Sequence, residues 1–219
     1  MKSERKLRPK QQEKRARILD AALKVFAQSG YSSASMDEIA LEAEVSKPTL
    51  YMYFGSKEAL FESMMLAGRD VMMEPFEHAS DDMVRDLHDF AWHYAEVVMR
   101  PEFLSLARLI ISEAHRFPEI GHAYQRAGPD RLLQGIIAYL EVQRAKSKLV
   151  FEDAELAAQD FWALILSAPR NKGLHTPDDI PGPADVRRYL ENGLHVFLRA
   201  YASNPVADSA RLNEIIKRR

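Results

Sequence analysis

Groups that donate hydrogen bonds to anionic oxygens are concentrated between positions 35 and 57 of this chain. The hydroxyl and ammonium groups in that stretch include those of Ser35, Ser46, Lys47, Thr49, Tyr51, Tyr53 and Lys57. Such groups can bind phosphate oxygens and the polar edges of bases. The sequence has no nucleophile signature, phosphate-binding glycine loop or metal-ligand helix motif. The chemistry that these residue types favour is therefore recognition rather than catalysis.

Short helices with serines at their beginnings must hold these groups in place. Ser35 precedes Met36-Asp37-Glu38 in a Ser-x-x-Glu capping box, which predicts the start of a short helix. Ser46 caps the next helix, with Pro48 in its first turn, where a missing N–H costs nothing. Ser56 caps a longer helix that follows. A first helix precedes all three and ends near Gly30; its apolar face is Ile18, Ala22, Val25 and Phe26.

The two short helices are joined by a tight turn near Glu44-Val45 and cannot be stable alone. They need support from the helices before and after them. The second of them directs outward the side chains of Ser46, Lys47, Thr49, Tyr51 and Tyr53. Its N-terminus adds free N–H groups and a partial positive charge. This is the arrangement of a helix-turn-helix unit, whose second helix enters the major groove of double-stranded DNA.

The same stretch closely resembles the TetR family of transcriptional regulators. The resemblance covers about residues 14–62 and rests on Gly30-Tyr31, Ser35 to Ala43, Val45 to Phe54 and Ser56 to Leu60. It implies that Ser35 contacts a phosphate and that Lys57 grips another. It implies that Tyr51 and Tyr53 touch the DNA backbone or bases. Base contacts are implied for Ser46, Lys47, Pro48 and Thr49.

Each of these side chains also has a purely structural interpretation. Tyr51 and Tyr53 suit half-buried core positions, and Lys57 suits a solvated charge on a capped helix. The serines suit caps whatever else they do. The joint pattern favours DNA contact, so replacing Tyr51 or Lys57 with Ala is expected to weaken DNA binding without unfolding the protein.

One residue in the turn departs from the family pattern. Glu44 stands where the family usually has glycine. A left-handed residue other than glycine costs on the order of 1 kcal/mol. Either the turn holds that strain or its geometry differs, and a Glu44→Gly variant that keeps DNA binding and gains stability would indicate the first.

Apolar residues recur at helical spacing along nearly the whole chain, and two-residue alternation is almost missing. This predicts an all-α protein of about nine or ten helices, with an N-terminal three-helix helix-turn-helix domain and a larger C-terminal helical bundle. The expected division is a basic flexible arm at 1–13, the DNA-binding domain at 14–62, a ligand-binding and dimerisation domain at 63–205 and a tail at 206–219. The clearest expected loop is 169–183, which is rich in Pro, Gly and Asp.

The larger domain is interpreted as a sensor for a small hydrophobic ligand. Its stretch from Arg100 to Leu132 resembles the AefR-like subgroup of the family. Aromatic and methionine side chains that suit a cavity lining are Phe90, Trp92, Tyr94, Met99, Phe103, Tyr124 and Trp162. The same residues suit an ordinary core. The helix that links the domains carries Met64, Met65, Met72 and Met73, so a ligand wedged against it would tilt the DNA-reading unit.

The final helices of the bundle, about 153–167 and 184–203, are the expected homodimer interface by resemblance to the family. A seam between subunits, or equally the core of one subunit, would use Phe161, Trp162, Ile165, Leu190, Leu194 and Phe197. A dimer suits the task, since two DNA-reading units on a palindromic operator multiply the contacts.

Composition narrows the remaining possibilities. Residues 1–60 hold 11 Lys and Arg against 8 Asp and Glu, whereas the remainder holds 19 against 24. A basic end on an acidic body suits a protein that presents one end to phosphates. Cysteine is absent, no apolar run is long enough to span a membrane, and the seven histidines lack metal-ligand spacing. The expectation is a soluble, cytoplasmic protein without a metal or cofactor.

Three functions are compatible with the fold that the sequence predicts. The leading one is a ligand-responsive transcriptional regulator, a repressor by family habit. A DNA-binding regulator whose body binds a protein partner is the alternative, and the sequence does not separate the two. An enzyme housed in the helical body is disfavoured because no catalytic motif is present.

Overall fold

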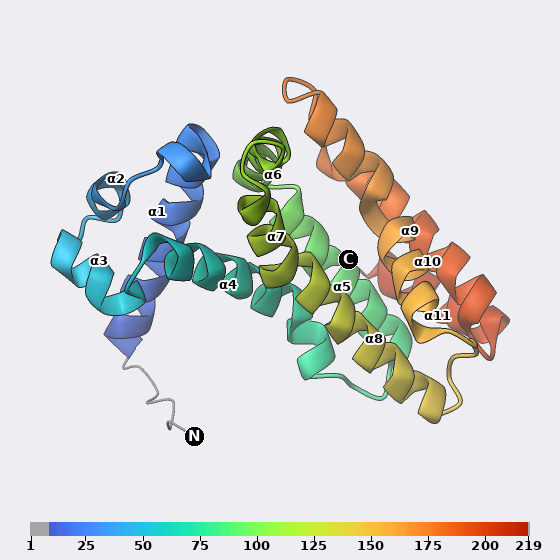
Figure 1. Cartoon of the computed structure of the whole chain (residues 1–219). Coiled ribbons are helices and arrows are strands. Elements are labelled where there is room, and N and C mark those ends of the chain that lie inside the picture. The colour runs from blue at the N-terminus through green and yellow to red at the C-terminus, as the bar shows by residue number, and fades with distance from the viewer. Residues whose placement is uncertain (1–8, 219) are drawn as a thin grey trace.

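The computed structural model describes residues 9–218, and within that range the protein is all-α, as the sequence predicts (Figure 1). The helices are α1 (Pro9–Ser33), α2 (Met36–Glu42), α3 (Lys47–Phe54), α4 (Lys57–Glu77), α5 (Met83–Val98), α6 (Pro101–Ala114), α7 (Pro118–Ala127), α8 (Pro129–Ala145), α9 (Ala154–His175), α10 (Pro183–Tyr201) and α11 (Pro205–Lys217). None of these helices is long and apolar enough to cross a membrane.

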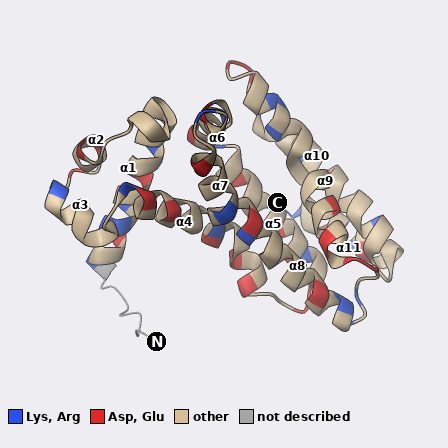
Figure 2. Cartoon of the chain, viewed as in Figure 1, with Lys and Arg blue, Asp and Glu red and all other residues tan. Residues whose placement is uncertain are grey.

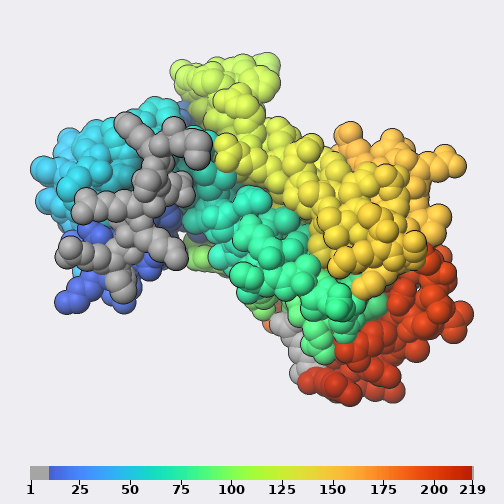
Figure 3. All heavy atoms as spheres, turned by 90° about the horizontal axis from the view of Figure 1, so that it is seen from below, coloured from blue at the N-terminus to red at the C-terminus, as the bar shows by residue number. Residues whose placement is uncertain are grey.

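The helices form two units that lie at opposite ends of the molecule. Helices α1–α3 and the first half of α4 surround one apolar core, which includes Phe26, Leu50 and Phe61 and against which buried residues of α6 and α7 also pack. Helices α5 and α8–α11 surround a second core, which includes Phe90 and Phe161. The space-filling view in Figure 3 shows the first unit at one end and the C-terminal helices at the other.

Helix α4 passes from one core into the other. Met64 and Met65, in its first half, are buried in the N-terminal core. Met72 and Met73, less than three turns further on, are buried in the C-terminal core. Because one continuous helix belongs to both cores, a displacement of its second half would be transmitted to its first half.

A second contact between the units runs between α1 and α6. Arg100, just before α6, donates to Asp20 of α1 at 3.0 Å, and the Ser32 hydroxyl donates to Glu113 at 3.2 Å. The α1 helix kinks at Gly30, which has φ 78°. The positive φ favours glycine at this position, whereas the Glu113 carboxylate that an added Cβ would meet is the end of a flexible side chain and can move aside.

About half of the region expected to be the clearest loop is helical, and this expectation was wrong for residues 169–175. Helix α9 continues through Pro169 to His175, and only residues 176–182 connect it to α10. Pro169 and Gly173 are buried on the same side of the helix as Ile165 and Leu166. Burial of this apolar stripe offsets the hydrogen bond that proline removes.

The two ends of the chain also differ from their sequence-based descriptions. Residues 206–219 were assigned to a tail, but Pro205–Lys217 forms α11, whose Leu212 and Ile215 are buried against the body. Arg211 fastens this helix to the start of α5 with two hydrogen bonds to Asp82, at 2.9 and 2.6 Å. Residues 9–13 of the expected arm begin α1, and residues 1–8 of that arm lie outside the described part of the chain.

Candidate functional site

The start of α2 is fixed by the capping box that the sequence predicts. The Ser35 side chain accepts a hydrogen bond from the Glu38 N–H at 3.1 Å, and the Glu38 carboxylate accepts one from the Ser35 N–H at 2.9 Å. Two N–H groups that the helix leaves unpaired are thereby satisfied. Ser35 is half-buried, and its position at the start of α2 is set by this pair of hydrogen bonds.

The turn between α2 and α3 is left-handed at Glu44, which has φ 51°. The Val45 N–H donates to the Ala40 carbonyl at 2.9 Å and closes the turn. The turn therefore holds the strain of a non-glycine residue rather than avoiding it by a different geometry. Glu44 itself is exposed, so packing of its side chain does not impose this conformation.

Helix α3 begins at Ser46 and presents two faces. The Ser46 side chain accepts from the Thr49 N–H at 3.3 Å and lies 2.8 Å from the Thr49 hydroxyl, while Pro48 occupies the first turn. Leu50 and Phe54 are buried against the N-terminal core. The cap and this buried pair fix the helix so that its opposite face is turned to solvent.

The solvent face of α3 carries most of the expected contact residues. Lys47 and Pro48 are exposed, Tyr51 is 43% exposed, and Tyr53 is half-buried beside Phe54. Met52, at 75% exposed, was not singled out from the sequence. Its position between Tyr51 and Tyr53, opposite the buried Leu50 and Phe54, was the feature of the sequence that could have predicted this exposure.

Lys47 lies at the N-terminal end of α3 and is the single charged residue of that helix; it accounts for the blue segment of α3 in Figure 2. Its ammonium lies 2.9 Å from the Asp37 carboxylate of α2, and both side chains are exposed. An exposed pair of this kind holds its partners weakly. Lys47 can therefore exchange the Asp37 oxygen for an oxygen of another molecule.

Lys57 is placed differently from the other members of the set. Its ammonium donates to the backbone carbonyls of Tyr31, Ser32 and Ala34 at 2.9, 3.3 and 3.1 Å and lies 4.8 Å from the centre of the Tyr31 ring. Burial and the Glu58 carboxylate raise the pKa of the Tyr31 phenol to about 12, so the ring stays neutral. Lys57 thus fastens the end of α1 to the start of α4.

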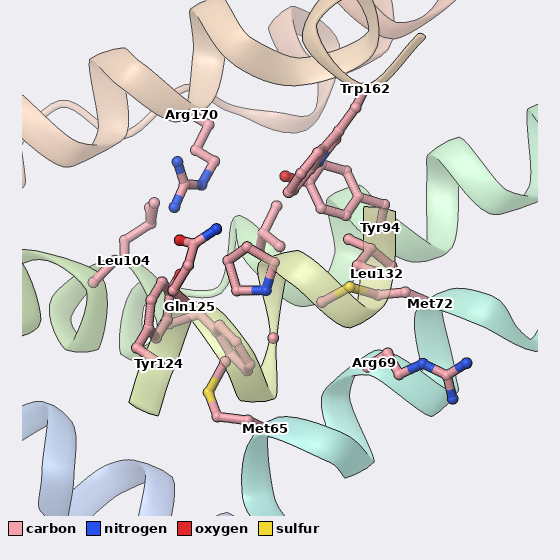
Figure 4. Close-up of a pocket in the computed structure, with 15 residues that line it drawn as sticks. Met65, Arg69, Met72, Tyr94, Leu104, Tyr124, Gln125, Leu132, Trp162 and Arg170 are labelled. Carbon is pink, nitrogen blue, oxygen red and sulfur yellow. The ribbon is translucent and has the colours of Figure 1, made fainter. Parts of the chain in front are cut away.

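A cavity of about 290 Å³ lies in the C-terminal unit, among α4–α9 (Figure 4). Four of the seven residues expected to line a ligand site do line it: Tyr94, Phe103, Tyr124 and Trp162. The remaining lining residues are Met65, Arg69, Met72, Val98, Leu104, Ala107, Gln125, Gly128, Pro129, Leu132 and Arg170. The walls are mostly apolar, as in sites for hydrophobic small molecules.

Three residues of the expected lining lie elsewhere. Phe90 is fully buried and stacked on Phe76, with their ring centres 4.4 Å apart. The Trp92 indole donates to His88 Nε2 at 3.0 Å, outside the cavity. Met99 ends α5 and packs on the C-terminal core. Residue type alone could not distinguish these positions from the lining. The face of the helix on which a residue lies decides whether it reaches the cavity.

The sequence did not point to Arg170, which lines the cavity from α9. It falls within the stretch expected to be a loop, and the continuation of α9 through Pro169 is what brings it to the cavity. On α4, Met65 and Met72 line the cavity, whereas Met73 packs against Gly135 of α8.

The residues proposed for a subunit seam belong mostly to the core of one subunit, the second of the two alternatives. Buried residues of the C-terminal core among them are Phe161, Ile165, Leu190, Leu194 and Phe197, whereas Trp162 lines the cavity. A subunit interface on α9 and α10 must therefore use the outer faces of these helices.

Comparison with protein-family models gives two matches that divide the chain as the fold does. Residues 18–64 match the model described as bacterial regulatory proteins, tetR family. Residues 85–203, more than half of the chain, match the model described as AefR-like transcriptional repressor, C-terminal domain. The chain belongs to the TetR family. TetR-family proteins are DNA-binding transcriptional regulators rather than enzymes.

Curated relatives match mainly the DNA-binding end. The uncharacterized regulator YuxN of Bacillus subtilis is 55% identical over 53 residues, which are 24% of this chain and 18% of that protein. The regulator UidR of Escherichia coli is 39% identical over 79 residues, 33% of this chain and 40% of UidR. The chain thus matches less than half the length of these TetR-family relatives.

Solved TetR-family structures match nearly the whole fold. A putative family member from Mesorhizobium loti has a TM-score of 0.71 at 28% identity, covering 89% of this chain and 100% of that one. The flavonoid-responsive regulator FrrA has a TM-score of 0.58 at 29% identity, covering 88% of this chain and 99% of FrrA. Their similarity extends over both units of this chain.

Proposed function

We propose that this TetR-family protein is a homodimeric repressor that binds a palindromic operator through α2 and α3 and is released by a small, mainly apolar ligand. The observation that carries the proposal is the course of α4. Its first residue, Lys57, fastens the helix to the end of α1, and Met65, Arg69 and Met72 line the cavity. These three residues are spaced four and three apart, so they share one face of the helix.

The proposed DNA contacts begin at the N-termini of α2 and α3. Ser35 contacts a phosphate, and base contacts come from the first turn of α3, namely Ser46, Lys47, Pro48 and Thr49. Tyr51 and Tyr53 contact the sugar-phosphate backbone or bases. The exposed Met52 adds an apolar surface suited to the methyl group of thymine. Lys57 is assigned a positioning role, because its three donors are directed to carbonyls inside the domain.

The proposed dimer forms through the outer faces of α9 and α10. These helices pack closely together at one side of the body (Figure 1). Leu156 of α9 is 63% exposed, and Tyr189 of α10 is also exposed. A twofold arrangement would place two copies of α3 on successive turns of the major groove, about 34 Å apart. The proposal places the protein in the cytoplasm, with DNA.

Selection of bound duplexes from a random DNA pool by the full-length protein tests the proposal. We expect one palindromic motif to be enriched. Tyr51→Ala should then weaken binding to that motif roughly tenfold or more. Ile111→Ala, which removes an exposed side chain of α6, is the matched control and should leave affinity unchanged. Failure of a folded, ligand-free protein to enrich any motif would contradict the proposal.

A further inference from the structure

Arg170 is a half-buried arginine directed into the cavity. It comes from α9, and its guanidinium points toward Gln125 and Leu104 across the space (Figure 4). Among the described residues, 9–218, it has no hydrogen-bond or ion-pair partner. A guanidinium keeps its charge at any accessible pH, and a half-buried charge without a partner is costly. The cavity therefore contains a cation that lacks its counter-ion.

The other charged and polar groups of the lining do not supply that counter-ion. The described residues that line the cavity include no Asp or Glu. The second arginine, Arg69, lies 2.8 Å from the Asp70 carboxylate and points away from the space (Figure 4). The Gln125 amide donates to the Asp130 carboxylate at 2.8 Å, and Asp130 itself does not line the cavity. The uncompensated charge in the cavity is thus positive.

The charge of Arg170 acts on the wall opposite. Burial raises the pKa of the Tyr94 phenol to about 12, and the Arg170 charge opposes that rise. Tyr94 and Trp162 lie together on one side of the cavity, and their rings meet edge to face with centres 6.1 Å apart. Apart from Arg170, Arg69 and Gln125, the lining is apolar and rich in aromatic residues, so it suits an apolar body.

We propose that the cavity binds an amphipathic carboxylate, with its carboxylate paired to Arg170 and its aromatic or aliphatic body against Tyr94, Phe103, Tyr124 and Trp162. The planar guanidinium offers two parallel N–H groups, which match the two oxygens of a carboxylate. The volume of about 290 Å³ limits the body to a small molecule. This inference rests on the proposed function in taking the cavity as the effector site.

Binding of matched probes to the full-length protein tests the inference without DNA. The probes are 2-naphthoate with 2-naphthamide, and decanoate with decanamide, each measured by isothermal titration calorimetry. We expect each carboxylate to bind about tenfold or more tightly than its amide, since one charged hydrogen-bonded pair contributes that much. Arg170→Gln should abolish the preference and change amide affinity less than about twofold.

Two variants and one further measurement keep the result interpretable. Arg126→Gln removes an exposed arginine of α7 outside the lining and should preserve the preference. Arg170→Lys, which keeps the charge without the planar fork, should retain part of it. Thermal unfolding followed by circular dichroism establishes that each variant is folded.

Three outcomes would overturn the inference: equal binding of acid and amide by the wild type, a preference that survives in Arg170→Gln, or no binding of any probe at about 1 mM. Operator binding by the ligand-free wild type and Arg170→Gln is measured separately. If neither binds DNA while the carboxylate preference depends on Arg170, the proposed function fails and the inference stands. If both bind DNA and the preference is absent, the inference fails and the DNA-binding part of the proposed function stands.

Discussion

Lys47 and Lys57 carry the same ammonium group in opposite surroundings. Lys47 reaches across solvent to one exposed carboxylate, whereas Lys57 is shared by three backbone carbonyls at the end of α1. The family resemblance implies a DNA contact for both, to bases for Lys47 and to a phosphate for Lys57, because residue type and position within the motif do not reveal where an ammonium points. The structure separates a side chain available for an external oxygen from one that holds two helices together.

Replacing each lysine with methionine tests this separation. Lys57→Met should lower the free energy of unfolding by about 1.5–3 kcal/mol, since three carbonyls lose a charged donor. Lys47→Met should leave stability nearly unchanged and weaken operator binding, because its ion pair with Asp37 is exposed on both sides. Urea unfolding and operator titration on both variants provide the measurement. A Lys57→Met protein as stable as the wild type would remove the positioning role and return Lys57 to the DNA contacts.

Glu44→Gly should raise the free energy of unfolding by about 1 kcal/mol and keep operator affinity, because glycine adopts φ 51° without steric cost. Ser147 also has a positive φ, of 57°, and lies far along the chain after α8. Ser147→Gly is therefore a control that relieves the same kind of strain outside the helix-turn-helix unit. Thermal unfolding measures both, and a loss of stability in Glu44→Gly would mean that its side chain contributes more than the strain costs.

Among the elements, α9 and α10 are packed at a spacing that only glycine permits. A Cβ added at Gly193 of α10 would overlap the Leu164 carbonyl oxygen and press on the backbone of Ile165. Backbone atoms cannot move aside as the end of a flexible side chain can. The two helices therefore form a closely joined pair, and the cavity residues Trp162 and Arg170 belong to it.

Gly193→Ala should destabilise the protein by about 2–3 kcal/mol, because the helices must separate to admit the methyl group. The matched control is Gly182→Ala, at the start of α10, where a Cβ would meet nothing within 4 Å. Chemical denaturation of both variants checks the difference. Equal stability of the two variants would show that the α9–α10 pair accommodates the methyl group by a small shift.

Across the whole molecule, α11 closes the C-terminal unit through the ion pair of Arg211 with Asp82. Burial tends to raise the pKa of the Asp82 carboxyl, but its hydrogen bonds with Arg211 and the Arg85 N–H outweigh this and lower it. A carboxyl whose pKa is lowered by folding stabilises the protein above its unfolded pKa of about 3.9 and loses that contribution as pH falls through the lower folded value.

Asp82→Asn should thus be less stable than the wild type at pH 7, with the difference shrinking toward pH 3. Asparagine keeps the cap that Asp82 provides at the start of α5, so the change reports mainly on the charge. Asp81→Asn, at a fully exposed neighbour, is the control. Urea unfolding at both pH values measures the effect, and a difference that does not depend on pH would rule out the ion pair as its source.

Much of this architecture could be predicted from the sequence. The caps at Ser35, Ser46 and Ser56 depend on local hydrogen bonds, so short motifs specify them; Gly30, the expected end of the first helix, is instead a kink, and α1 continues to Ser33. The course of α9 beyond Pro169 could not be predicted, because it depends on apolar burial against helices distant in the sequence. The same limit applied to Arg170 and to the three residues placed wrongly in the cavity lining.

Because α4 passes through both cores, a small rotation of this helix at the cavity would become a larger movement at its N-terminal end. Met72, the last cavity residue on α4, lies 15 residues from Lys57, or about 22 Å at 1.5 Å per residue, so a pivot of about 5° at Met72 would carry Lys57 through roughly 2 Å. In a twofold pair the two arms would swing in opposite senses and double the change in their separation. A displacement at the cavity no larger than one methyl group would thereby be amplified. The two copies of α3 would then no longer fit successive turns of the major groove.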